Sequence, residues 1–396
     1  MNFRADEGST RQPSLAVDRR NFIKIIAAGG IVSLLQGCDE MPASAIAPWN
    51  GPSHDLTDIR LRALSWAILA PNPHNLQSWM ADVREKDTVR LLVDQTRLLK
   101  ETDPENRQIL IGCGAFLELF GAACTAYGHR ADVHLFPEGS YSPHSVDHRP
   151  FAEIRVESTA SFVGDSGIFQ VMRDRRSAKM AYSRRTPSAD DFAALANAFQ
   201  FPLVEFGHAA NPAEARTITD LAKNGYAVEF GNRRTLQESL HAIRLGTDAI
   251  ARDPSGIALH GPLFWWGRKL GLIDDKSIAD PDNPRVRASL GKFAEVLDQT
   301  PSWGWLRSKD NSSLAQIEAG RAYLRVNLEA ARRGLAVHPN SQVLEEFSEM
   351  NQLFSQFHRQ VGVSAPERVQ MLFRIGFCER PSPPTPRRAL ENIVIT

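Results

Sequence analysis

The chain has 396 residues, of which 42% are hydrophobic and 23% charged, as expected for a globular protein with a sizeable core. Its 46 basic and 46 acidic residues balance, which excludes the basic footprint of a general nucleic-acid binder. With Cys38 set aside, three cysteines remain and no CxxC pair occurs, which excludes a disulfide framework. About 350 residues beyond the N-terminal segment favour roughly two domains.

The N-terminal segment has the pattern of an export signal. Residues 18–24 read Asp-Arg-Arg-Asn-Phe-Ile-Lys and precede an apolar run that ends near Leu35. The run is shorter than the roughly 20 residues that span a bilayer, and small residues follow it. The paired arginines resemble the twin-arginine motif, whose pathway exports folded proteins. We therefore predict a twin-arginine signal and linker over residues 1–47, recognition by the twin-arginine export machinery, and a periplasmic or cell-envelope location.

Two processing sites compete at the end of this signal. Residues 35–38 read Leu-Gln-Gly-Cys and resemble a lipobox, in which Cys38 becomes the lipidated first residue. Small-x-small patterns over residues 43–47 instead place the cut after Ala45 or after Ala47. The first alternative anchors the protein in a membrane through Cys38, and the second releases it.

The first half of the chain alternates helical and strand patterns. Apolar spacing over residues 56–68 predicts a helix, which ends before Pro71 and Pro73. Residues 88–94 alternate and predict a strand. Residues 106–127 are strongly apolar and predict a long helix that Gly128 terminates. Strands are expected over residues 133–136 and 152–157.

The second half repeats this order with an added segment. Helices are expected over residues 168–175, 188–199 and 211–251, and a strand over 203–206. Residues 252–312 are rich in Gly, Pro, Asp and Trp and predict an irregular insertion. Helices over 314–333 and 341–361 and a strand over 369–377 follow, and residues 381–386 are proline-rich. The aromatic residues at 264–266 and 303–305 form either a lid over a site or a satellite core.

A long helix followed by a glycine and an apolar strand occurs in both halves, at Gly128 and at Gly334. This parallel suggests duplication of one α+β unit. Coincidence is the alternative, because helix–glycine–strand sequences are common.

Three polar segments carry the chemistry that the sequence offers. The motifs GxGxxG, HExxH and GxSxG and the P-loop are absent, and we predict no metal site. An amide-rich loop spans residues 70–79, a basic cluster residues 173–179, and a basic pair residues 387–388. Amides both donate and accept hydrogen bonds, and clustered cations with a hydroxyl hold phosphate. Taken singly, the first segment has a polar loop as its alternative, the second a solvated helix end and the third an ordinary basic tail.

In this order the segments resemble the nitroreductase superfamily, and specifically its tandem-duplicated Acg-type branch. The best match is Ala-Pro-x-x-His-Asn-x-Gln-x-Trp at residues 70–79, although Ser78 stands where the family usually has proline. Arg-Arg-Ser-x-Lys at 175–179, Gly-Leu-Ala-Val-His-Pro at 334–339 and Pro-Arg-Arg at 386–388 are similar to further family segments. The resemblance implies an α+β, nitroreductase-like fold of two fused units that form an intramolecular pseudo-dimer, each an antiparallel-dominated sheet with helices. The units are expected over residues 48–165 and 166–380, the latter with the 252–312 insertion, and a C-terminal extended arm over 381–396.

The resemblance also implies one FMN at the junction of the two units, and no catalytic side chain. A bound FMN would sit among residues of both units, with its phosphate near the arginines. His338 is either a proton donor near the ring or a packed histidine. The implied cofactor-binding residues are His74, Asn75, Gln77, Arg175, Arg176, Ser177, Lys179, Pro339, Arg387 and Arg388.

The function expected from this resemblance is that of an exported FMN-dependent oxidoreductase acting on a small aromatic or quinone-like acceptor. Export separates the protein from cytoplasmic nicotinamide cofactors, so the alternative is an FMN-binding or FMN-sequestering protein without turnover. A structural lipoprotein on a degenerate flavoprotein scaffold is a third reading. Fusion of the units makes a monomer or a weak homodimer the expected state.

Overall fold

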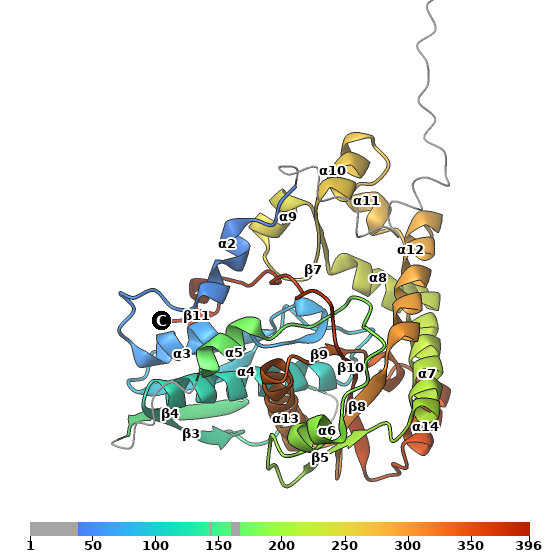
Figure 1. The fold of residues 1–396 in the computed structure, drawn as a ribbon. Coiled ribbons are helices and arrows are strands. Elements are labelled where there is room, and N and C mark those ends of the chain that lie inside the picture. The colour runs from blue at the N-terminus through green and yellow to red at the C-terminus, as the bar shows by residue number, and fades with distance from the viewer. Residues whose placement is uncertain (1–38, 143–144, 160–166) are drawn as a thin grey trace, which may run out of the picture.

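The computed structural model describes residues 39–142, 145–159 and 167–396. The predicted twin-arginine motif and Cys38 lie outside these residues. Within them the chain forms two main sheets with helices between and around them, and the predicted α+β class is confirmed (Figure 1). The arrangement of two units as a pseudo-dimer stays a prediction.

The first sheet has the strand order β11-β1-β2-β4-β3. Its consecutive neighbours run antiparallel, except that β11 runs parallel to β1. The C-terminal strand therefore completes a sheet that the N-terminal half builds. The bounds are β1 (Trp79–Asp82), β2 (Thr88–Val93), β3 (His129–Leu135), β4 (Ala152–Ser158) and β11 (Val394–Ile395).

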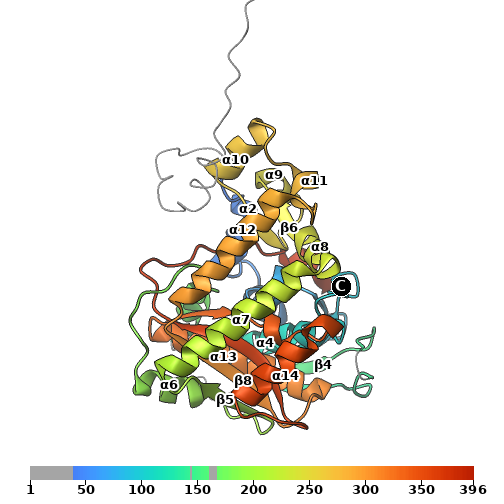
Figure 2. The same cartoon turned by 90° about the vertical axis from the view of Figure 1, so that its right-hand side faces the viewer.

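The second sheet is antiparallel throughout, in the order β5-β8-β10-β9. Its strands are β5 (Val204–His208), β8 (Ser302–Ser308), β9 (Ala336–Pro339) and β10 (Arg368–Gly376). Side chains alternate between its faces, as a pleated strand requires. Trp303 and Trp305 of β8 pack with α7 (Pro212–Gly231) and α14 (Asn351–Gln360), which Figure 2 shows in front of the sheet. Leu306 packs on the opposite face with α6 (Ala189–Ala196) and α13 (Ser313–Arg332).

Two long helices, α4 (Arg107–Ala126) and α13, pack against each other at the centre of the molecule. Gly114 of α4 and Gly320 of α13 sit at the contact, where each backbone faces a carbonyl oxygen of the other helix. Helix α4 is apolar on nearly all sides because α3 (Ile59–Ala67), α13 and the first sheet surround it. By length and composition α4 is apolar enough to cross a membrane, but most of it is buried inside the protein.

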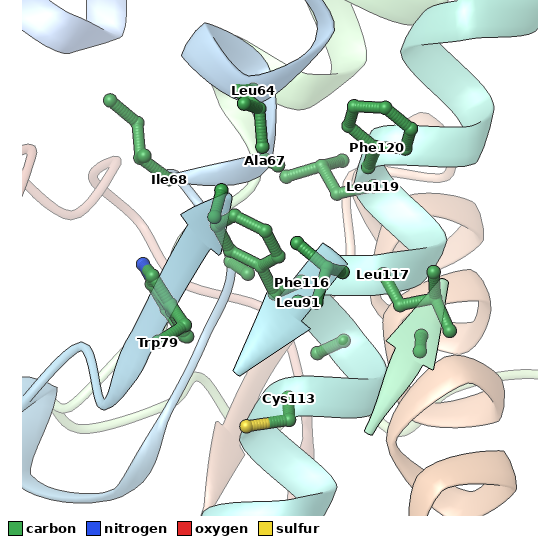
Figure 3. Close-up of a cluster of buried hydrophobic side chains, with 14 of the residues drawn as sticks. Leu64, Ala67, Ile68, Trp79, Leu91, Cys113, Phe116, Leu117, Leu119 and Phe120 are labelled. Carbon is green, nitrogen blue, oxygen red and sulfur yellow. The ribbon is translucent and has the colours of Figure 1, made fainter. Parts of the chain in front are cut away.

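The first core lies between α3, α4 and the first sheet (Figure 3). Trp79 of β1 meets Phe116 of α4 with ring centroids 4.7 Å apart, and Leu91 of β2 lies beside them. Cys113 and Cys124 are buried on α4, and burial raises the pKa of both thiols. Both behave as small apolar residues, as their position in an apolar helix indicates.

The segment expected to be an irregular insertion is largely ordered, and part of it is core. Residues 302–308 form β8, a central strand of the second sheet, so the predicted boundary at residue 312 is wrong. Gly304 separates the two tryptophans because the rings of Phe206 and Phe373 leave no room for a Cβ. Helix α9 (Thr247–Arg252) ends where the segment begins, and the rest of the segment forms β7 (Ile257–Leu259), α10 (Pro262–Lys269), α11 (Asp275–Ile278), α12 (Pro284–Glu295) and η3 (Val296–Gln299).

Several smaller elements complete the chain. The helix expected over residues 341–361 is interrupted, and only its second part, α14, is α-helical. A short parallel pair, β6 (Ile243–Leu245) and β7, stands apart from the main sheets. The remaining elements are α2 (Ala43–Ile46), η1 (Ala47–Asn50), η2 (Pro73–Asn75), α5 (Ile168–Asp174), α8 (Arg233–His241), η4 (Gln342–Leu344), η5 (Ser348–Met350) and η6 (Leu390–Asn392).

Candidate functional site

Three guanidinium groups from distant parts of the chain converge on one tryptophan. Arg175 follows α5, Arg176 is its neighbour, and Arg387 comes from the C-terminal arm. Their Cζ atoms lie 5.8, 3.9 and 5.3 Å from the ring centroid of Trp49 in η1. Arg175 and Arg387 are only 2% and 3% exposed, and both donate to the carbonyl oxygen of Leu69, at 2.7 and 3.2 Å. We call this site the arginine cluster. It consists of Arg175, Arg176 and Arg387 with Trp49 and the carbonyl group of Leu69.

The arginine cluster forms no ion pair with an acidic side chain in the part of the chain that the structure describes. The Nε atoms of all three arginines and Nη1 of Arg175 are buried without a hydrogen-bond partner among the described residues. Burial lowers the pKa of Arg175 to about 10. Burial, together with Arg175 and Arg176, lowers the pKa of Arg387 well below its ordinary value.

Such a group of buried cations has a chemical consequence. Removing charges from water is costly unless each is paired, so three neighbouring guanidiniums need an anion with several acceptor oxygens. Phosphate meets this need because its oxygens accept several charge-assisted hydrogen bonds from guanidinium forks. The arginine cluster is therefore a candidate phosphate site.

The chain after α5 runs beside the second sheet. Arg175 has extended rather than helical dihedral angles (φ −57°, ψ 127°), which ends α5. The N–H of Ala178 then donates to the carbonyl oxygen of Val337 in β9 at 2.9 Å. This contact places residues 175–179 alongside the strand that carries His338 and Pro339. The predicted basic cluster and the predicted β9 segment are thus brought together.

Lys179 lies within electrostatic reach of two histidines. Burial lowers the pKa of His74 to about 4, and the charge of Lys179 contributes. The pKa of His338 is lowered well below its usual value by burial, by Arg374 and by Lys179. Lys179 itself keeps accessible surface, although enough protein surrounds its ammonium to lower its pKa. The two histidines are therefore neutral at pH 7 beside a cation that solvent reaches.

His74 begins a chain of buried polar groups that sequence reasoning missed. Its Nε2 lies 3.0 Å from Oγ of Ser239 in α8. That hydroxyl donates to Oε1 of Glu229 in α7 at 2.9 Å. Burial raises the pKa of Glu229 to about 7. The helical spacing does indicate that Glu229 is buried, because it falls four residues after Gly225 on the buried face of α7.

The amide-rich loop holds the C-terminal arm in place. His74, Asn75 and Gln77 all have φ near +50°, a left-handed conformation. The Asn75 amide donates to the carbonyl oxygens of Gly256 and Pro386, and its oxygen accepts from Arg387. These bonds hold Arg387 in its position within the arginine cluster.

Two of the predicted cofactor residues have partners inside the protein. The Gln77 amide is buried, donates to the carbonyl oxygen of Pro254 at 2.9 Å, and accepts from the backbone N–H of Arg388 at 2.7 Å. Arg388 pairs with Asp94 at 3.4 Å and donates to the carbonyl oxygen of Asn392 at 2.6 Å. The structure gives Gln77 and Arg388 a scaffolding position, so Arg387 alone of the basic pair joins the cluster.

Further unsatisfied polar atoms lie near β9. His338 Nδ1 and Asn340 Oδ1 are buried, and no described residue forms a hydrogen bond with either atom. Pro339 stands between them, and Ser177 lies on the neighbouring segment; both are half-buried.

Among the residues from 39 onward that the structure describes, no three His, Cys, Asp or Glu side chains group as metal ligands do.

Comparisons with known proteins point to one group of relatives. No family model matches the chain. It is 27% identical over 356 residues to a Mycobacterium tuberculosis protein with the provisional name NAD(P)H nitroreductase acg, covering 85% of this chain and 95% of that protein. It is 25% identical over 349 residues to the Serratia protein PigM, also provisionally named an NAD(P)H nitroreductase, covering 84% and 92%. The predicted resemblance to Acg-type nitroreductases is confirmed.

Solved structures match more weakly. A nitroreductase with bound FMN from Bacteroides fragilis is 12% identical, with a TM-score of 0.33, over 56% of this chain and 94% of that one. The FMN- and NADPH-dependent nitroreductase NfnB of a Sphingopyxis strain is 14% identical, with a TM-score of 0.35, over 58% and 98%. Likeness at this level carries no argument about the site.

Proposed function

We propose that this chain, which resembles Acg-type nitroreductases over most of its length, binds one FMN and is an oxidoreductase for a small aromatic or quinone-like acceptor. The observation that carries the proposal is the arginine cluster, in which Arg175 and Arg387 are buried, Arg176 is half-buried, and no ion pair to an acidic side chain occurs among the described residues. A phosphate that accepts from Arg175, Arg176 and Arg387 supplies the missing counter-charge. The resemblance selects FMN among phosphate-bearing cofactors.

The remaining polar groups suit the rest of such a cofactor and its substrate. A bound FMN supplies the redox chemistry, and the protein positions and tunes it. Lys179 offers a cation that solvent reaches. His74 and His338, neutral at pH 7, offer hydrogen-bonding nitrogens. The residues implied for FMN thus reduce to His74, Arg175, Arg176, Ser177, Lys179, Pro339 and Arg387, with Asn75 positioning Arg387.

The chain of groups behind His74 suits a reaction that consumes protons. Reduction of a quinone or nitro compound takes up protons with electrons. Glu229 holds a proton over much of the range below its pKa of about 7, and Ser239 Oγ connects its Oε1 to Nε2 of His74. We assign this chain the delivery of protons toward His74: the Ser239 hydroxyl turns to donate its proton to Nε2 of His74 and accepts the proton of Glu229 in its place, which reverses its bond to Oε1.

The same site is compatible with retention without turnover. The near-complete burial of Arg175 and Arg387 favours a cofactor that is held tightly and released slowly. Storage of FMN is therefore the second candidate function.

Absorbance and turnover together test these two candidates. We expect protein incubated with FMN and desalted to be yellow, with about one flavin per chain. We expect dithionite-reduced protein to be reoxidised by an added quinone under anaerobic conditions. Yellow protein that passes no electrons from NAD(P)H or dithionite to any acceptor would favour storage. Colourless protein that cannot be reconstituted would contradict both.

We propose export by the twin-arginine pathway and a lipid anchor at Cys38. What supports the lipobox over cleavage near Ala45 is the packing of residues 39–50. The Asp39 carboxylate accepts from the Thr247 N–H at 2.7 Å, and the Ala45 carbonyl oxygen accepts from the Arg387 N–H at 2.8 Å. A cut after Ala45 or Ala47 would remove a group that holds the arginine cluster.

Mass spectrometry of the processed chain checks this choice. We expect the N-terminal peptide to begin at Cys38 and to carry a diacylglyceryl group. A processed chain that begins at Ile46 or Pro48 would contradict the lipobox assignment, without bearing on FMN binding.

A further inference from the structure

Helix α10 presents apolar side chains that the protein core does not use. Trp266 is 47% exposed and Leu270, the residue after the helix, is 56% exposed. Within the described residues, Leu314 is the other exposed large hydrophobic residue, at 37%. The flanking apolar side chains Phe264 and Trp265 are half-buried, and neither belongs to any of the three core clusters. The helix therefore carries an apolar surface that no other described part of the chain covers.

The same stretch is cationic. Residues 261–273 contain Arg268 and Lys269 and no acidic residue. The Lys269 ammonium lies 5.5 Å from the ring centroid of Trp265, and the two neighbouring tryptophans meet edge to face at 4.7 Å. Tryptophan beside lysine and arginine is the composition that favours a membrane interface, where rings enter the headgroup region and cations meet anionic lipids.

Helix α10 adjoins the point at which the described chain begins. The N–H of Gly261, which precedes the helix, donates to the carbonyl oxygen of Asp39 at 2.9 Å. The Arg268 guanidinium and the Asp39 carboxylate both lie against Gly246. Figures 1 and 2 show α10 at the end of the molecule farthest from the two main sheets. An acyl anchor at Cys38 would be attached one residue before Asp39, which contacts this helix.

We propose that α10 and the turn after it, residues 262–272, dock on the surface of an anionic phospholipid bilayer. The exposed apolar residues enter the headgroup region, and Lys269 meets the negative lipid surface. A lid over the arginine cluster fits less well, because no hydrogen bond joins α10 to a residue of that cluster within the described chain. The proposal draws on the predicted anchor for its orientation only, because bilayer binding by α10 is measurable without an acyl chain.

Vesicle co-sedimentation tests the proposal on the chain from Cys38 to residue 396, with Cys38→Ser so that no lipid is attached. We expect binding to vesicles of phosphatidylcholine with 30% phosphatidylglycerol and weaker binding to pure phosphatidylcholine. Trp266→Ser with Leu270→Ser should lower the partition coefficient at least tenfold. Leu314→Ser, a matched exposed leucine on α13, should leave it unchanged. Lys269→Gln should lower binding to the anionic vesicles about fivefold and have little effect with neutral ones.

The outcomes separate this proposal from the others. Equal binding by the double variant and by Leu314→Ser, or no binding of the parent protein to anionic vesicles, would overturn it. A double variant that binds vesicles normally but changes the rate of quinone reduction would replace it with the lid. Because the substituted side chains are exposed, an unchanged thermal unfolding midpoint verifies that the fold is kept. FMN content, measured on the same samples, reports independently on the cofactor proposal.

Discussion

Arg175→Met is expected to stabilise the ligand-free protein and to weaken FMN binding. In the ligand-free state the Arg175 guanidinium is buried with two nitrogens lacking partners, so an apolar side chain of similar length should raise the free energy of unfolding by about 1 kcal/mol or more. The Leu69 carbonyl oxygen keeps its bond from Arg387. Loss of a charge-assisted phosphate contact, worth about 1.5–3 kcal/mol, lowers FMN affinity about 10- to 100-fold. Urea unfolding and flavin fluorescence titration measure the two effects.

Arg388→Met is the matched control for this prediction. Arg388 is also nearly buried, but it pairs with Asp94 and donates to backbone oxygens of Gln77 and Asn392. Its removal leaves those groups unsatisfied, so the free energy of unfolding should fall. Opposite signs for Arg175→Met and Arg388→Met are the expected pattern. A loss of stability in both would mean that the arginine cluster is internally satisfied and needs no anion.

Gly320→Ala is expected to destabilise the fold by several kcal/mol or to prevent folding. A Cβ on Gly320 would lie under 3.0 Å from the carbonyl oxygen of Ile111, closer than real Cβ atoms approach. The obstacle is the backbone of α4, which no side-chain rotation relieves, so the central pair of helices must separate. Overpacking usually costs about 1–3 kcal/mol, and a backbone clash in the main helix contact belongs at or above the top of that range. Urea unfolding monitored by circular dichroism measures the loss.

Gly121→Ala on α4 is the control. A Cβ at Gly121 meets nothing within 4 Å. Alanine in a helix interior is favoured over glycine by about 0.5–1 kcal/mol, so this variant should be as stable as the parent or slightly more so. Equal effects of the two substitutions would show that α4 and α13 are not in backbone contact at Gly320.

Local patterns in the sequence predicted the elements that local interactions build. The helix expected over residues 106–127 is α4 to within a residue at each end, because an apolar run bounded by Gly128 has few alternatives. Strand β8 was missed because Trp303 and Trp305, separated by a glycine, have the pattern of a loose aromatic cluster. Only its two partner strands, β5 and β10, distant in sequence, make it central.

In the site, too, the contacts between residues distant in sequence could not be predicted. Resemblance supplied Arg175, Arg176 and Arg387, and the structure brings them together. It did not supply Trp49, which lies between the predicted signal of residues 1–47 and the first matched segment at residue 70. Neither Ser239 nor Glu229 has a sequence pattern that points to His74. Their contact depends on how α7 and α8 pack against a loop more than 150 residues earlier.

The central claim is that the arginine cluster binds the phosphate of FMN, and comparing FMN with riboflavin tests it most directly. Riboflavin has the same ring and ribityl chain but no phosphate. We expect the parent protein to bind FMN at least 100-fold more tightly than riboflavin. Arg175→Met should narrow that ratio by lowering the affinity for FMN alone. Equal affinities of the parent protein for the two flavins, or an equal loss of both in Arg175→Met, would contradict the claim.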